Sequence, residues 1–167
     1  MCIPTNEEYD RLLDTAGEDE SRTHWDNIYS WVDDKKEEYC LDAYNRAVRG
    51  CVSARYWNNY HASYRSGYVG FRPAFELCEI DTLAPKGELS IVGTLYMDGE
   101  PVEVPMVPTY CGDVAEYIPG AKLEIRTPVN HPGYIITGYR VGDVVIADRA
   151  LLNGISCLDI EKALQGG

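Results

Sequence analysis

"RYWNNYHASYRSGYVGFRP", residues 55–73, differs in composition from the rest of this acidic chain. It combines arginine, tyrosine, asparagine and serine and contains no acidic residue, although the chain carries a formal net charge of −12. Asparagine, serine and glycine disfavour a helix, so we do not expect a helix here, and residues 68–80 are expected to form a strand pair or a bent strand. The run also contains a tyrosine at every fourth position, namely Tyr56, Tyr60, Tyr64 and Tyr68.

Charge divides the sequence into blocks. Residues 1–42 contain thirteen acidic residues, residues 43–75 contain none but five arginines, and residues 76–167 are acidic again. Because phosphate binding depends on lysine and arginine, the net charge argues against nucleic acid as a direct partner. The acidic block serves solubility or docks on a basic surface of another protein. The acids expected to form such a docking surface are Glu18, Asp19, Glu20, Asp33, Asp34, Glu37 and Glu38.

The general properties of the chain indicate an intracellular globular protein. Its 167 residues suit one medium domain or two small ones. No run reaches the roughly 18 apolar residues of a membrane helix, and the N-terminus lacks the basic and apolar regions of a secretory signal. The six cysteines are irregularly spaced and form no C-x-x-C pair, so we expect reduced, mostly buried thiols and no bound metal or cofactor.

Local signals predict an α+β fold. In "PTNEEYDRLLD" (4–14), Thr5 and Glu8 have the spacing of a capping box at a helix start. Asp98-Gly99, between two extended runs, is a strong hairpin signal. Further strands are expected within 121–128, 133–141 and 143–152, and Ser156 is expected to cap a short closing helix.

The residue composition and the pattern of expected elements change near residue 80, which suggests two units. Residues 1–80 contain few aliphatic residues in their centre, whereas residues 81–167 read as a small β-rich unit with a terminal helix. The stretch "DTLAPKGE" (81–88) is the expected joint. The sequence leaves open whether the two units share one core.

Three motifs of the first unit resemble a known family. "IPTNEEYDRLL" (3–13) resembles the "LPTEAEWE" helix of formylglycine-generating-enzyme-like proteins, "AVRGCVSARYW" (47–57) resembles their "RGGSW" strand, and "SYRSGYVGFRPAFEL" (63–77) resembles their closing "R…GFR" strand. The resemblance covers about residues 2–80 and implies a reduced C-type-lectin-like module, as in phage and gut-bacterial proteins. The oxidising members use a cysteine pair before the GFR strand, where this chain has "HASYRSGYV" (61–69). The resemblance therefore implies a module without oxidase activity.

The run around residues 55–64 has the composition of a binding surface. Tyrosine and tryptophan provide rigid contact area, and asparagine and serine adapt their hydrogen bonds. Trp57, Phe71, Arg72 and Phe75 are expected to be structural, whereas the tyrosines and asparagines remain open between surface and interior. The residues that are expected to bind a small polar ligand are Arg55, Tyr56, Asn58, Asn59, Tyr60, His61 and Tyr64.

Three hypotheses for function follow. The first is a non-catalytic mobile-element (phage) protein in the cytoplasm of a bacterial host, an anti-CRISPR-like inhibitor whose acids cover the basic groove of a nucleic-acid-targeting defence effector. The second is a module that binds a sugar or nucleotide through the Tyr/Asn/Arg run. The third is an enzyme centred on Cys51 or His61; it is the weakest, because no second catalytic group appears at a defined spacing. The oligomeric state is left open.

Overall fold

Two β-sheets and three helices make up the part of the chain that this computed structural model describes, residues 1–33, 44–104 and 113–165. The predicted α+β class is confirmed. The helices are α1 (Asn6–Ala16), α2 (Glu20–Thr23) and α3 (Cys157–Gln165), with 3-10 turns η1 (Leu77–Glu79) and η3 (Pro132–Tyr134). Within these described ranges, no helix has the length and apolar character needed to cross a bilayer.

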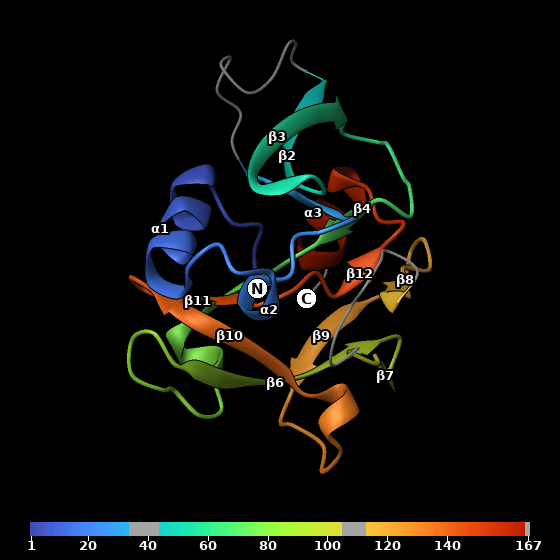
Figure 1. The fold of residues 1–167 in the computed structure, drawn as a ribbon. Coiled ribbons are helices and arrows are strands. Elements are labelled where there is room, and N and C mark those ends of the chain that lie inside the picture. The colour runs from blue at the N-terminus through green and yellow to red at the C-terminus, as the bar shows by residue number, and fades with distance from the viewer. Residues whose placement is uncertain (34–43, 105–112, 166–167) are drawn as a thin grey trace.

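The first sheet carries the central run of the sequence at its edge. Figure 1 shows β2 and β3 at the top of the molecule, away from β6 and β10 of the second sheet. In spatial order, the first sheet contains β3 (Ser53–His61), β2 (Asn45–Gly50), β1 (Tyr29–Trp31), β4 (Val69–Phe71), β12 (Leu152–Asn153) and β8 (Ala115–Glu116). The second contains β5 (Ala74–Glu76), β11 (Val144–Ala147), β10 (Ile136–Val141), β6 (Leu89–Met97) and β7 (Glu100–Pro101), with β9 (Leu123–Arg126) also paired to β6.

The elements with a strong local signal form as expected. The Glu8 amide donates to the Thr5 hydroxyl, and the Glu8 carboxylate accepts from the Thr5 amide, which completes the capping box of α1. Asp98 and Gly99 both have positive φ, 51° and 82°, as the predicted hairpin turn requires. The Ser156 hydroxyl accepts from the Asp159 amide at the start of α3. Residues 53–61 form a strand rather than a helix.

Each sheet combines strands from before and after residue 80. β5 pairs with β11 in the second sheet, and β12 pairs with β4 in the first. One hydrophobic cluster includes Ile3, Phe71, Leu95 and Ile160, so the two segments of the sequence share a core. The division into units at residue 80 stays a prediction.

The described cysteines correct one expectation. Cys157 is buried and Cys51 is half-buried, but Cys2 and Cys78 are exposed, so the prediction of mostly buried thiols is wrong for these two. Each lies at a margin of the second sheet, where one side of the chain faces water: Cys2 pairs with Ala74 of β5 in an isolated bridge, and Cys78 lies in η1.

Arg72 lies fully buried directly after β4. Its guanidinium donates to the carbonyl oxygens of Thr23 and His24, the latter at 2.6 Å, and stacks 3.9 Å from the ring centroid of Trp25. The Tyr9 hydroxyl donates to the Trp31 carbonyl, with a longer contact of 3.4 Å to the Arg72 carbonyl. The expectation that Arg72 is structural is confirmed, and its planar fork reaches two backbone acceptors at once.

Replacing Arg72 by methionine or lysine should therefore destabilise the protein on the order of 3 kcal/mol, because both changes leave buried carbonyls without their donors. Lysine keeps the charge but not the fork. Urea unfolding followed by tryptophan fluorescence measures the effect. Arg11→Lys, at a side chain that is 58% exposed, is the matched control and should change the free energy of unfolding by less than about 0.5 kcal/mol. An Arg72→Lys variant as stable as this control would contradict the assigned role.

Candidate binding surface

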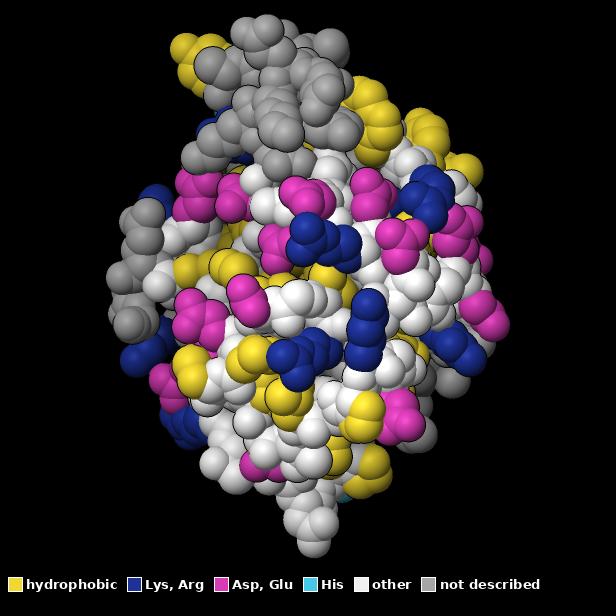
Figure 2. Space-filling model, turned by 90° about the vertical axis from the view of Figure 1, so that its left-hand side faces the viewer, with side chains coloured by type: hydrophobic (Ala, Val, Ile, Leu, Met, Phe, Trp, Pro, Cys, Tyr) yellow, Lys and Arg dark blue, Asp and Glu magenta, His cyan; other side chains and the backbone are white. Residues whose placement is uncertain are grey.

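Exposed aromatic side chains concentrate on the β2–β3 end of the molecule. Among the described residues, ten large hydrophobic side chains are exposed, and six of them fall within residues 44–68. A local concentration of exposed apolar side chains marks an interaction site more often than scattered apolar residues do. Figure 2 shows hydrophobic side chains on both sides of the grey residues at the top of the molecule, and others across the middle of this face. The six are Tyr44, Val52, Tyr56, Trp57, Tyr64 and Tyr68.

β3 places alternate side chains on opposite faces of the first sheet. Tyr56, Asn58 and Tyr60 share one face, and there they meet Tyr29 of β1: its ring lies 6.2 Å from Tyr56 and 5.7 Å from Tyr60 between centroids. Tyr64, in the loop after β3, stacks on Tyr60 at 4.8 Å with 21° between the ring planes. We call these five residues, Tyr29, Tyr56, Asn58, Tyr60 and Tyr64, the tyrosine face.

Tyr29 forms the floor of the tyrosine face and is only 8% exposed. Burial raises its pKa to about 12, against the opposing effect of a hydrogen bond with the Asn58 side chain. Burial also raises the pKa of Tyr60, which hydrogen bonds with Tyr29. The hydroxyls thus remain protonated at neutral pH and join the rings into one polar and aromatic network. Tyr29 was not among the predicted site residues; the aromatic and buried character of "WDNIYSW" (25–31) was its only signal in the sequence.

The remaining predicted ligand residues lie on the opposite face of β3. Arg55 pairs with Glu18 and lies 3.6 Å from the Asp10 carboxylate. The Asn59 side-chain oxygen accepts from Asn45 at 2.9 Å, and the His61 ring stacks on Tyr44. The structure therefore divides the seven predicted ligand residues between two faces, with Tyr56, Asn58, Tyr60 and Tyr64 together and Arg55, Asn59 and His61 apart from them.

Trp57 corrects a second expectation. It was predicted to be structural, like Phe71, Arg72 and Phe75, which are all fully buried. Trp57 is 43% exposed instead, because it alternates away from the tyrosine face on a strand at the edge of the sheet. Its exposure adds a large aromatic side chain to the β2–β3 end of the molecule.

The predicted acidic surface is only partly described. Glu18, Asp19 and Asp33 are exposed. Glu20 opens α2 rather than lying in a loop, and its side chain, like Asp34, Glu37 and Glu38, is outside the described residues. Figure 2 shows acidic side chains interspersed with basic ones on the face that it displays. Glu18 is itself paired with Arg55, so this pairing offsets part of the negative charge next to β3.

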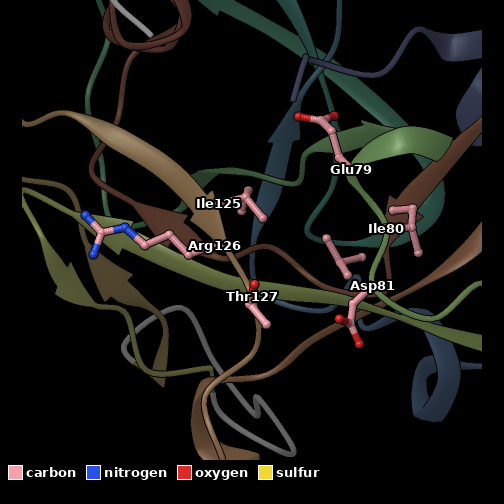
Figure 3. Close-up of a pocket in the computed structure, with 7 residues that line it drawn as sticks. Glu79, Ile80, Asp81, Ile125, Arg126 and Thr127 are labelled. Atoms are coloured by element: carbon pink, nitrogen blue, oxygen red, sulfur yellow. The ribbon is translucent and has the colours of Figure 1, made fainter.

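A hollow of about 220 Å³ between η1 and β9 has charged residues at its edge. Figure 3 shows Ile125 and Thr127 in the middle, Ile80 and Asp81 on one side, Glu79 above them, and the Arg126 side chain extending outward on the other side. Arg126 is engaged by Glu124 and by the ring of Tyr96. These charged groups do not converge on one point, so their arrangement does not indicate a catalytic or ligand-binding site. Nor does the described part of the chain contain a cluster of three His, Cys, Asp or Glu side chains able to hold a metal ion.

Comparison with known proteins adds no relative: no family model, curated protein or solved structure gives a significant match to the chain. The resemblance of residues 2–80 to formylglycine-generating-enzyme-like proteins therefore stays a prediction from three short motifs.

The raised pKa of Tyr29 predicts a loss of stability in alkali. A folded-state pKa of about 12, above the ordinary value near 10, favours the folded state fully below pH 10 and loses this effect as the pH rises toward 12. Ultraviolet titration at 295 nm should show one fewer late-titrating tyrosine in Tyr29→Phe. Tyr68→Phe, at a side chain that is 61% exposed, is the matched control. An unaltered late step in Tyr29→Phe would show that Tyr29 is not the buried hydroxyl described here.

Proposed function

We propose that this protein is a non-catalytic binding protein that acts by protein–protein contact through the tyrosine face and the exposed aromatic side chains around it. The observation that carries the proposal is the concentration of six of the ten exposed large hydrophobic side chains within residues 44–68. Tyrosine, tryptophan and arginine are the residues that most often dominate the energy of protein interfaces. β3 is also an edge strand, so its side chains project at the margin of the sheet.

Three features favour a protein over a small molecule as the partner. Tyr60 and Tyr64 stack on each other, so the two rings are not separated to hold a flat ligand between them. Tyr56, Tyr60 and Tyr64 line neither the hollow between η1 and β9 nor a second pocket that lies against α3. Small ligands usually bind in concave pockets, whereas exposed aromatic patches of this extent suit a protein interface.

The charge of the chain supports a basic partner. A net charge of −12 steers the protein toward positively charged surfaces and suppresses binding to acidic ones. Glu18, Asp19 and Asp33 are exposed, and Glu18 reaches Arg55 of β3. A basic nucleic-acid-binding groove of a host defence effector has the matching chemistry, and inhibition of such an effector, in the manner of an acidic anti-CRISPR protein, is the specific form of the proposal.

The alternative is a sugar or nucleotide bound by the tyrosine face. Its support is the hydrogen-bonded group of Tyr29, Asn58 and Tyr60, which offers polar atoms beside aromatic rings. In that case Tyr60→Ala and Tyr64→Ala should weaken binding of the small ligand, whereas a protein that binds only the acidic surface should be unaffected.

The proposal is tested by affinity measurement on matched variants. Tagged protein captures a partner from a bacterial lysate at low and moderate salt, and interferometry then measures its affinity for wild type and variants. Tyr56→Ala/Tyr64→Ala, at side chains 42% and 41% exposed, should weaken binding at least about tenfold while the fold survives. Binding should also weaken as salt increases, because surface charge is screened.

The control removes exposed apolar side chains elsewhere. Leu83→Ala/Leu89→Ala, at side chains 43% and 46% exposed, should leave the affinity unchanged. Equal affinity of the tyrosine variant and wild type would refute the proposed surface. Binding that is lost with the tyrosines but insensitive to salt would retain the surface and remove the basic partner. Capture of no protein at either salt concentration would favour the small-ligand alternative.

A further inference from the structure

A second pocket lies between the loop after β3, the turn before β9 and α3. It has a volume of about 400 Å³, within the range of about 300 to 1,000 Å³ that small-molecule sites occupy. Its apolar wall comes from Tyr117, Ala121 and Ala163, all buried. The Tyr117 hydroxyl donates to the Ala121 carbonyl at 2.8 Å, which fixes the ring against the turn.

The charged lining of this pocket has the opposite sign to the rest of the protein. Arg65, Lys122 and Lys162 contribute three positive charges, and Asp159 contributes one negative charge. The lining therefore carries a net charge of about +2 in a chain of −12. Since only 15 of 167 residues are lysine or arginine, three of them around one hollow is a marked local concentration.

Asp159, the acidic residue of the pocket, is paired with Arg65. Asp159 accepts the Nε and Nη2 donors of Arg65, each at 2.7 Å, and also accepts the Ser156 amide at 2.9 Å. These interactions hold the pKa of the Asp159 carboxyl at about 2, so it remains ionised and paired at neutral pH. The pair holds the guanidinium at the pocket in a fixed orientation, with Asp159 on one side of it.

Several positively charged donors remain available. Among the residues that the structure describes, neither Arg65 Nη1 nor the Lys162 ammonium has a hydrogen-bond or ion-pair partner. Lys122 has only the Glu124 carboxylate at 3.4 Å, and its side chain is 60% exposed. An oriented guanidinium with two flexible ammonium groups is the donor set that binds phosphate and carboxylate groups.

We propose that this pocket binds a small dianionic ligand through Arg65, Lys122 and Lys162, with the Tyr117 side of the pocket receiving its apolar part. The shared chemistry is a doubly charged oxyanion, which a phosphomonoester or a dicarboxylate supplies. The proposal is independent of the tyrosine face, because the two sites share no residue.

Isothermal titration with inorganic phosphate, pyrophosphate and succinate, at matched ionic strength in chloride buffer, tests the site. Wild type should bind at least one of these anions saturably. Lys122→Ala/Lys162→Ala should raise the dissociation constant at least tenfold, since it removes two of the three cations while the Arg65–Asp159 pair remains. Lys86→Ala/Arg140→Ala removes two positive charges outside the pocket and should leave the dissociation constant within about twofold of wild type.

The three anions also identify the group. Tighter binding of phosphate or pyrophosphate than of succinate supports the site and assigns a phosphoryl group, whereas the reverse order supports the site and assigns a dicarboxylate. The proposal is overturned if wild type binds none of the three anions saturably. It is equally overturned if both double variants lose binding to the same extent, because general charge would then explain the affinity.

Discussion

The buried guanidinium of Arg72 is the interaction on which the first sheet depends. It binds the carbonyls of Thr23 and His24 at the end of α2 and stacks on Trp25, so it fixes the segment that leads from α1 into β1. His24 has a positive φ of 42°, a conformation that a non-glycine residue keeps only when its surroundings hold it. β1 and β4, which run parallel and adjacent, are thereby placed so that Tyr29 faces the strand pair β2–β3. The binding surface therefore depends on a buried contact that is not itself part of it.

Local chemistry made part of this fold predictable. The capping box of Thr5 and Glu8 and the Asp98-Gly99 turn depend on neighbouring residues alone, and both form as expected. The pairing of β5 with β11 and of β12 with β4 depends on contacts between distant segments, for which a single sequence has no local signal. Trp57 illustrates the same limit within the site: its residue type indicates a core position, and only the register of β3 at the sheet edge turns it outward.

The loop of residues 62–68 connects the two proposed sites. At its beginning Tyr64 stacks on Tyr60 of the tyrosine face, and the next residue, Arg65, pairs with Asp159 at the cationic pocket. The loop is held further by the Leu158 amide, which donates to the Ala62 carbonyl, and by the Gly154 amide, which donates to the Ser66 carbonyl. One segment thus presents an aromatic surface on one side and a positive charge on the other, and both depend on its attachment to α3. The two surfaces differ in chemistry, since the tyrosine face is aromatic and uncharged whereas the pocket is cationic.

The "GFR" motif, residues 70–72, is explained by packing within this chain, without reference to a protein family. A Cβ added to Gly70 would lie 2.4 Å from the Leu152 carbonyl oxygen, so only glycine allows β4 and β12 to approach. Phe71 fills the core and Arg72 holds the α2 segment. All three residues act in packing, so the motif does not by itself indicate an activity. Side chains that packing does not require are the ones available for function. Around β3 these include the exposed residues Tyr56, Trp57 and Tyr64.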